Sequence, residues 1–328
     1  MSLQIGSVSR TSVARRARVR ALAKINLDLR VLHRRPDGYH AIRTVFQTVS
    51  LGDTIDIEFR PARRTKIELN SNIEIGENLV VRAARLVLDA MRVRGEVRFS
   101  LKKIIPMGAG LGGGSTDAGA VLLALPVLAG KHLPLESLHA LGLQLGSDVP
   151  FFLYGGTAAG LGRGEELYPL PTPAAGPGLL VASGVHVSTA EAYQALGREL
   201  TSAAQSPIMN SFQTLVWNLG EGLPIEAWAS RCENDFEAAV FARHPRLKAL
   251  KRKLQRLGAT PALMTGSGSA LFGLFRTEED VECALPQFRE ERALPISLVS
   301  RSRYRSLWFR QLRAHVDGAE WPPRSRYA

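Results

Sequence analysis

A glycine-rich segment near the middle of the chain constrains the fold more than any other feature of the sequence. Residues 106–117 read Pro-Met-Gly-Ala-Gly-Leu-Gly-Gly-Gly-Ser-Thr-Asp. The residues before it, 97–101, alternate between apolar and polar as in a half-buried strand, and the residues after it, 118–128, are apolar enough for a buried helix. The sequence therefore predicts a strand, a glycine turn and a helix, with Ser115, Thr116 and Asp117 capping the start of the helix.

A turn of this kind is suited to bind an anion. Glycines leave backbone N–H groups unshielded, and the N-terminus of a helix adds the positive end of its dipole. A flexible linker is the alternative, but linkers are not held between a strand and an apolar helix. No Gly-Lys-Ser/Thr follows as in Walker A, and the third glycine of a dinucleotide fingerprint is missing at its offset. We therefore expect a phosphate loop that takes its positive charge from elsewhere in the chain.

A strand near the N-terminus supplies candidates for that charge. Residues 19–31 alternate strictly, with one face apolar and the other carrying Lys24, Asn26 and Asp28. The second face is expected to meet either water or a binding site. Lys24 and Asn26 are candidates to hold a phosphate or a hydroxyl group, although an outward lysine on a strand is more often simply solvated.

A turn follows this strand and presents two rings. Residues 36–38, Pro-Asp-Gly, are typical of a tight turn, and residues 42–49 are expected to return as the second strand of a hairpin. Tyr39 and His40 stand just past the turn, where an aromatic ring and an imidazole can stack on a base. Hairpin tips also carry such residues without a function, so this pattern alone is weak.

An acidic residue is expected on rigid backbone further along. Residues 135–145 predict an amphipathic helix that stops at Gly146, and residues 151–154 are expected to form a buried strand. Asp148 lies between them and shortly before Pro150, which restricts the preceding residue. Asp148 is therefore either a turn residue or a catalytic carboxylate with little freedom.

The remaining elements follow from periodicity. Residues 262–272 predict a hairpin around the tight Gly266-Ser267-Gly268-Ser269 turn, a second glycine-rich site. We further expect a turn at 51–53, strands at 54–59, 155–164, 179–182 and 296–299, helices at 77–92, 192–200, 234–257 and 278–288, and a loop at 201–211.

Length and composition set the general class. A chain of 328 residues exceeds one compact core, and the Pro-rich stretch 169–177 is the best boundary between two domains. No apolar run reaches the length of a membrane span, so no membrane association is expected. Two cysteines are too few for a disulfide framework, which favours a cytoplasmic location.

The charge is concentrated at the two ends. Of the formal net charge of +12, residues 1–20 carry +5 and residues 301–328 carry another +5, which leaves +2 for everything between. Basic ends more often solvate a terminus than read a nucleic acid. We therefore expect a small-molecule substrate and no nucleic-acid partner.

Together these motifs resemble the GHMP kinases, the family named for galactokinase, homoserine kinase, mevalonate kinase and phosphomevalonate kinase. The segment 106–116 resembles their ATP-phosphate loop, and 263–272 their second glycine loop. Three motifs narrow the resemblance to the branch that phosphorylates cytidine-diphosphate methylerythritol in non-mevalonate isoprenoid synthesis: Ala-Lys-Ile-Asn-Leu at 23–27, Arg-Pro-Asp-Gly-Tyr-His at 35–40 and Asp-Val-Pro-Phe-Phe at 148–152. The sequence departs from relatives at Ala109 and at Thr116-Asp117, where glycine and Ser-Asn are frequent, and Asp117 places a negative charge near the phosphates.

The resemblance implies an α+β fold with the two-domain GHMP kinase architecture. The N-terminal domain would be similar to the second domain of ribosomal protein S5, and the C-terminal domain would be ferredoxin-like, with ATP and substrate in the cleft between them. On this basis we expect an ATP-binding domain at 17–172, a C-terminal domain at 173–310, and basic tails at 1–16 and 311–328.

The resemblance also implies phosphoryl transfer from ATP, with Mg²⁺, to the 2-hydroxyl of the cytidine-diphosphate alcohol. Asp148 would be the general base and Lys24 would orient it, while positioning and electrostatics supply most of the catalysis. Tyr39 and His40 would recognise the cytosine, and Asn26 would lie near the methylerythritol hydroxyls. The other residues expected to bind substrate are Gly266, Ser267 and Gly268, and those expected to bind ATP are Pro106, Met107, Gly108, Ala109, Gly110, Leu111, Gly112, Gly113, Gly114, Ser115 and Thr116. No residue is assigned as a metal ligand.

Two alternatives remain. Another GHMP kinase, such as homoserine or mevalonate kinase, would have no base for Tyr39 and His40 to contact. An RNA-binding module of related fold would explain the basic ends, but the nearly neutral body and the two glycine loops count against it.

Overall fold

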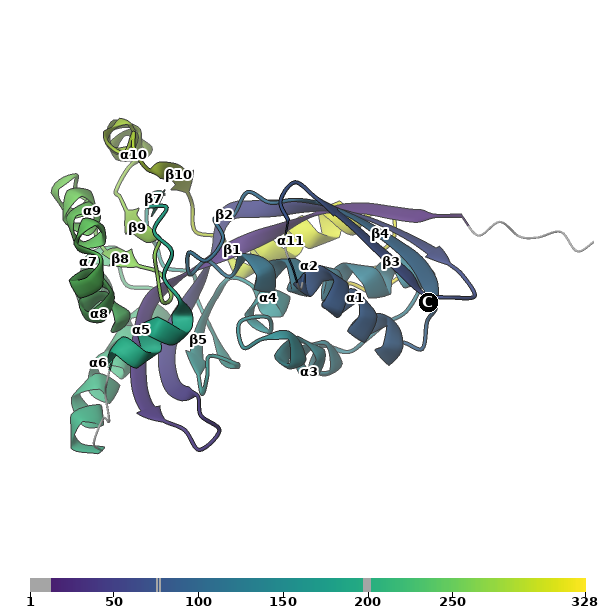
Figure 1. The fold of residues 1–328 in the computed structure, drawn as a ribbon, viewed down its shortest axis with the longest axis horizontal. Helices are drawn as coiled ribbons and strands as arrows, with labels where there is room; N and C mark the ends of the chain where they lie inside the picture. Colours follow the sequence, from purple (N-terminus) through teal and green to yellow (C-terminus); the bar gives the residue numbers. More distant parts are fainter. Residues whose placement is uncertain (1–12, 75, 77, 197–201) are drawn as a thin grey trace, which may run out of the picture.

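The computed structural model describes residues 13–74, 76, 78–196 and 202–328 of the chain. One very long hairpin, residues 15–61, is part of the first of its two sheets, and the second sheet packs against this hairpin (Figure 1). The elements of the N-terminal half are β1 (Arg15–Arg34), β2 (His40–Pro61), β3 (Lys66–Ser71), α1 (Leu79–Ala90), β4 (Gly95–Lys102), α2 (Gly113–Ala129), α3 (Leu135–Leu145), α4 (Phe151–Tyr154), β5 (Thr157–Leu161) and β6 (Glu166–Leu170). Those of the C-terminal half are β7 (Gly178–Ala182), α5 (Thr189–Leu196), α6 (Ser202–Gly220), α7 (Ile225–Trp228), η1 (Ala229–Arg231), α8 (Phe236–Arg243), α9 (Pro245–Arg256), β8 (Ala262–Met264), β9 (Leu271–Leu274), α10 (Glu278–Ala284), η2 (Leu285–Gln287), β10 (Arg292–Ile296) and α11 (Arg301–Leu312).

The first sheet has the strand order β3-β4-β2-β5-β6, with β1 paired antiparallel to β2. The strands β3 and β4 run parallel because α1 crosses between them, as in a βαβ unit. In Figure 1 the helices α1, α2 and α3 lie on one side of these strands. The core between them includes Val87, Leu122 and Phe59, all fully buried. The N-terminal half is thus an α+β unit.

The second sheet has the order β10-β7-β9-β8 and is antiparallel throughout. With helices between β7 and β8 and between β9 and β10, this is the βαββαβ arrangement of a ferredoxin-like domain. Alternating side chains separate its faces: Leu179 and Leu271 pack against α8 and α9, whereas Leu180 and Phe272 pack toward β1. The expected α+β class and ferredoxin-like second half are confirmed.

The strand β1 belongs to the cores of both halves. Its apolar residues enter three hydrophobic clusters in succession: Val19 and Ala21 the first, Ile25 and Leu27 the second, and Leu29 and Val31 the third. The second and third clusters also contain side chains of the second sheet. The polar face of β1 was expected to meet either water or a binding site. It does not meet open water, because Lys24, Asn26, Asp28 and Arg30 are all buried.

Two local predictions fail because a short apolar or turn-like pattern was ambiguous. Residues 151–154 form a single helical turn and not a strand; Pro150 already has helical angles, and Gly155 ends the turn at φ +63°. At 51–53 no turn forms, because β2 runs on unbroken from 40 to 61 and includes the expected third strand. A Cβ at Gly52 would stand 2.7 Å from Leu22 and 2.9 Å from the Ala21 carbonyl oxygen, so this glycine allows close strand approach.

Two further predictions had the wrong element or limits. Most of the expected loop at 201–211 lies in α6, and residue 201 is outside the described residues. The helical spacing of the buried residues Phe212, Leu215 and Leu219 begins only after this stretch, so the stretch itself carried no helical pattern. The last strand, β10, ends at Ile296 instead of starting there. The helices α1, α3, α8, α9 and α10 and the strands β4, β5, β7, β8 and β9 lie close to their expected positions.

The last residues of the chain pack on the N-terminal half. Trp308 and Leu312 of α11 are buried in the first cluster, beside Ala17 and Leu22 of β1. Further on, the Trp321 Nε1 donates to the Leu153 carbonyl oxygen at 3.1 Å. At the other end, residues 15 and 16 already belong to β1, and residues 1–12 are outside the described part. The division into 17–172 and 173–310 with basic tails remains a prediction.

Candidate functional site

A cleft of about 1190 Å³ lies between the two halves and collects most of the residues singled out from the sequence. Its walls come from β1, the hairpin tip, both glycine loops, the α3–α4 turn and the segment around α5. The predicted site residues that line it are Lys24, Asn26, Tyr39, His40, Gly108, Gly110, Gly112, Asp148, Gly266, Ser267 and Gly268.

Lys24 and Asp148 meet in this cleft. The Lys24 Nζ lies 3.6 Å from the Asp148 Oδ2 and donates to the Asn26 Oδ1 at 2.7 Å. The lysine side chain is 5% exposed and the aspartate side chain 34%, so the carboxylate faces the cleft with the ammonium group behind it. Asp148 is held on ordered backbone, because Val149 N donates to Gly146 O (3.1 Å) and Phe152 N donates to Val149 O (3.1 Å). A carboxylate so placed can accept a proton from a bound hydroxyl group.

The first glycine loop leads into the N-terminus of α2 through three glycines with positive φ: Gly108 (+62°), Gly110 (+77°) and Gly112 (+68°). Gly112 is the N-cap, so the expected caps at Ser115, Thr116 and Asp117 are wrong. Thr116 instead donates through its hydroxyl to the Leu22 carbonyl oxygen at 2.8 Å. The first N–H groups of a helix have no acceptor within the helix, which leaves this end suited to a phosphate.

Other residues of this loop lie away from the cleft wall. Ala109, Leu111 and Thr116 are buried in the protein core, and the Met107 side chain is 60% exposed. Pro106, Gly113, Gly114 and Ser115 are also absent from the cleft lining. ATP contacts for these residues stay a prediction.

The two glycine loops touch backbone to backbone. A Cβ at Gly110 would lie 2.1 Å from the Thr265 carbonyl oxygen, and one at Gly266 would lie 3.0 Å from the Gly110 Cα. The Ala270 N–H donates to the Ala109 carbonyl oxygen at 3.3 Å. Only glycine permits this approach. The sequence predicted both loops, but nothing in their spacing along the chain indicated that they are in contact.

Asn26 joins the Lys24–Asp148 ion pair to the second glycine loop. Its Oδ1 accepts from the Gly266 N–H (3.0 Å) as well as from Lys24, and its Nδ2 donates to the Thr44 hydroxyl (2.7 Å). Asn26 is 3% exposed. These partners occupy much of its side-chain hydrogen-bonding capacity, so contact with a substrate hydroxyl stays a prediction.

The lining of the cleft also contains a group of rings. The His40 imidazole stacks on the Tyr193 ring with centroids 4.9 Å apart and planes 16° apart, and Phe236 meets Tyr193 edge-on at 4.8 Å. The Arg163 guanidinium lies 4.9 Å from the centroid of the exposed Tyr39 ring. Tyr193 and Arg163 were not predicted, because each is an ordinary residue of its own segment and only the fold brings it here.

Burial favours the uncharged forms of the His40 and Tyr193 side chains. Burial, with a smaller contribution from Arg34, holds the pKa of His40 below its ordinary value. Burial, and then the charge of Asp148, raises the pKa of Tyr193 to about 12. At neutral pH His40 is therefore uncharged, with one nitrogen donating and the other accepting.

Asp117 faces away from the cleft. Its carboxylate pairs with the Lys103 Nζ at 2.7 Å, and the same ammonium group contacts Asp53, so one lysine sits between two acids. All three side chains are 4% exposed or less. The expected negative charge near the phosphates is thus directed into the protein beneath the loop.

Among residues 13–74, 76, 78–196 and 202–328, no three histidine, cysteine, aspartate or glutamate side chains are grouped so that they could hold a metal ion. Over the same ranges, no helix is both long and apolar enough to cross a membrane.

Comparison with known proteins defines the class and then the family. Residues 78–156 match the model of the GHMP kinases N terminal domain and residues 218–292 that of the GHMP kinases C terminal domain, which makes the chain an ATP-dependent small-molecule kinase. A 4-diphosphocytidyl-2-C-methyl-D-erythritol kinase of Solibacter usitatus (strain Ellin6076) is 55% identical over 320 residues, covering 96% of this chain and 99% of that protein. The chain therefore belongs to the family of 4-diphosphocytidyl-2-C-methyl-D-erythritol kinases.

Solved structures agree with this assignment. The crystal structure of a 4-(cytidine 5'-diphospho)-2C-methyl-D-erythritol kinase has a TM-score of 0.71 at 36% identity, covering 86% of this chain and 98% of that one. A homoserine kinase from Cytophaga hutchinsonii has a TM-score of 0.69 at 18% identity, over 90% and 97% of the two chains, and shares the fold.

Proposed function

We propose that this kinase transfers the γ-phosphoryl group of ATP to the 2-hydroxyl of 4-diphosphocytidyl-2-C-methyl-D-erythritol, a step in non-mevalonate synthesis of isopentenyl diphosphate. The observation that carries the proposal is that one cleft holds an acid–lysine pair, a glycine loop at a helix N-terminus and a group of rings. The names of the relatives support the same substrate.

The proposed reaction uses Asp148 as general base. Its carboxylate accepts the proton of the 2-hydroxyl while that oxygen attacks the γ-phosphorus, and the bond to the β-phosphate oxygen breaks to release ADP. Lys24, 3.6 Å away, holds the carboxylate in place and balances its charge. The glycine loop and the N-terminus of α2 receive the phosphates.

The donor set of the cleft is compatible with Mg²⁺. Of the described residues that line it, Asp148 is the one carboxylate. Proteins commonly bind Mg²⁺ through one or two carboxylates together with substrate phosphates. In this kinase the phosphate oxygens would supply most of the ligands, and Mg²⁺ would neutralise charge on them.

The rings would bind the cytosine. Stacking on an aromatic ring is worth roughly 1–3 kcal/mol per base but hardly distinguishes bases. The choice of cytosine must therefore come from hydrogen bonds to the ring edge, where neutral His40 can donate or accept.

A coupled ADP-release assay tests this function. We expect turnover with the cytidine-diphosphate alcohol, strongly reduced use of its uridine analogue, and none with homoserine or mevalonate. His40→Ala should raise the KM for the cytidine-diphosphate alcohol far more than the KM for ATP. His33→Ala, at an exposed histidine outside the cleft lining, is the matched control and should change neither. Equal use of the two pyrimidine compounds would contradict the proposal for His40.

A further inference from the structure

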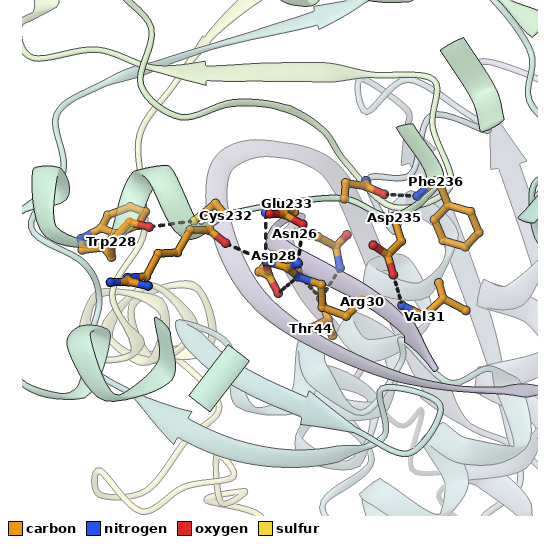
Figure 2. Close-up of polar contacts among 12 residues, drawn as sticks. Asn26, Asp28, Arg30, Val31, Thr44, Trp228, Cys232, Glu233, Asp235 and Phe236 are labelled. Carbon is orange, nitrogen blue, oxygen red and sulfur yellow. Dashed lines mark hydrogen bonds and ion pairs between the residues drawn. The ribbon is translucent and has the colours of Figure 1, made fainter. Parts of the chain in front are cut away.

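A short segment of the C-terminal half lies alongside β1 and is here called the tether (residues 231–235). Figure 2 shows it next to β1, near Asp28 and Arg30. The Leu29 N–H donates to the Glu233 carbonyl oxygen (2.8 Å) and the Asp235 N–H donates to the Leu29 carbonyl oxygen (3.0 Å), which makes a parallel bridge between Leu29 and Asn234. The Asp235 Oδ2 also accepts from the Val31 N–H at 2.9 Å.

Buried charges fix the tether in this place. The Asp28 Oδ1 accepts from the Glu233 N–H (2.8 Å), and the Arg30 Nη2 donates to the Arg231 carbonyl oxygen (2.7 Å). Arg30 Nε lies 3.0 Å from both Asp28 carboxylate oxygens, and the guanidinium also contacts the Glu233 carboxylate. Both Asp28 and Arg30 are nearly inaccessible to solvent. Since an unpaired buried charge is strongly unfavourable, this network opposes displacement of the tether.

Asn234, in the middle of the tether, reaches the second glycine loop. Its Nδ2 donates to the Met264 carbonyl oxygen (2.7 Å) and to the Gly266 carbonyl oxygen (2.9 Å), and its Oδ1 accepts from the Phe236 N–H (3.0 Å). Asn234 is buried and does not line the cleft. Gly266 is thus held from both sides, because its N–H is bound to Asn26 and its carbonyl oxygen to Asn234.

We propose that Asn234 is a positioning residue for phosphoryl transfer, which acts by fixing Gly266 against Gly110. It touches neither ATP nor the acceptor, and it sets the distance between the two glycine loops. The position of Gly266 also affects Lys24, because Asn26 accepts hydrogen bonds from both. The kinetic part of the inference rests on the proposed function. A displacement of about 1 Å at such a site lowers turnover by roughly 100-fold in other enzymes, so a modest shift of Gly266 has a measurable effect.

The first test variant removes the Asn234 Nδ2 donor and keeps the shape of the side chain. Asn234→Asp keeps the acceptor for the Phe236 N–H but sets a carboxylate against two carbonyl oxygens. Asn234→Ser, which keeps a side-chain oxygen able to accept from the Phe236 N–H but removes the amide donor, is the second variant if the first does not fold. Ser325→Ala is the matched control, because it removes another buried hydrogen bond, to the Val127 carbonyl oxygen, far from the cleft.

Two readouts are used on the full-length protein. By hydrogen exchange with mass spectrometry, we expect peptides covering residues 262–270 to exchange about tenfold faster in Asn234→Asp, whereas peptides of β4 keep their rates. In Ser325→Ala, the peptides covering residues 262–270 should keep their rates. In the ADP-release assay we expect kcat to fall roughly 10- to 100-fold with the KM for ATP within about threefold.

The exchange readout does not depend on which alcohol is phosphorylated, so a wrong substrate assignment would leave it intact. Unchanged exchange at 262–270, or a uniform increase along the chain as in a merely destabilised protein, would overturn the inference. A kcat equal to that of the unmodified enzyme would overturn it as well.

Discussion

Asp148 and Lys24 lie on elements far apart in the sequence, and their 3.6 Å contact exists only in the folded protein. We predict that Asp148→Asn lowers turnover roughly 100- to 10,000-fold, the usual range for a general base, with ATP affinity nearly unchanged. Lys24→Met should have a loss of similar size. In the double variant the losses should not add, because one group positions the other.

The measurement is kcat beside a direct ATP titration on variants shown to be folded by circular dichroism. A folded Asp148→Asn protein with full activity would remove this residue from the mechanism.

Asp117 should make the stability of the protein depend on pH. Burial raises its pKa to about 7, Lys103 opposes this shift and Asp53 adds to it. A folded-state pKa above the unfolded value means that the folded protein holds the proton more tightly, so stability falls as the pH rises from about 4 to about 7. Asn cannot ionise. We therefore predict that Asp117→Asn gains roughly 1–2 kcal/mol relative to the native protein at pH 8 and little at pH 5.

Urea unfolding of both proteins at the two pH values measures this difference. A gap between the two unfolding free energies that is the same at pH 5 and pH 8 would show that Asp117 does not titrate in the folded state over this range.

At the level of elements, the two glycine loops contact each other backbone to backbone. Gly110→Ala places a Cβ 2.1 Å from the Thr265 carbonyl oxygen at a φ of +77°. We predict a loss of roughly 2–5 kcal/mol in unfolding free energy, from backbone strain and overpacking together, and a KM for ATP raised about tenfold or more. Gly222→Ala has a similar φ of +67° with nothing within 4 Å, so it isolates the cost of strain alone.

Thermal unfolding and ATP kinetics of these two variants separate the effects. If both lose the same stability and Gly110→Ala keeps its KM for ATP, close approach of the loops is not important for binding.

Much of the element pattern was predictable because it is local. The strand–glycine–helix unit around 106–117, the hairpin tip and the second glycine turn all follow from periodicity and turn chemistry within short windows. The failures have a common cause. Whether 151–154 is a strand or a helical turn, and whether Gly52 bends the chain or lets strands approach, depends on neighbours that are distant in sequence.

The same limit applies to the cleft. Lys24, Asp148 and the glycine loops came from motifs with their own chemistry, and the fold brought them together. Tyr193, Arg163 and Asn234 carry no local signal, since a tyrosine on an amphipathic helix or an asparagine before a helix is ordinary. Each is important through a contact with another element. Tyr193 stacks on His40, the Arg163 guanidinium faces the Tyr39 ring, and Asn234 donates to two carbonyl oxygens of the second glycine loop region.

At the level of the whole molecule, the C-terminal residues support the N-terminal half. Trp321 donates to Leu153 O, and its ring lies beside Tyr304 and below the Arg305 guanidinium. We predict that Trp321→Ala costs roughly 2–3 kcal/mol and lowers Tm by about 5 °C or more, while kcat at 25 °C stays within about twofold. Trp217→Ala is the matched control: that side chain is 72% exposed on α6, and its Tm should change by less than about 2 °C.

Differential scanning calorimetry measures both Tm values. Equal shifts in the two variants would show that the contacts of Trp321 do not stabilise the fold.

The strand β1 contributes to three hydrophobic clusters, and this bears on how such an enzyme can diversify. Recombination could replace the C-terminal half of this chain by that of a relative. The relative's second sheet would then have to pack on the β1 of this chain, and its segment equivalent to the tether would face Asp28 and Arg30 without the partners that they have here. The two halves are therefore not interchangeable modules. We expect acceptor specificity in this architecture to change by substitutions within the cleft. The other route is exchange of the second half together with the long hairpin β1–β2 on which it packs.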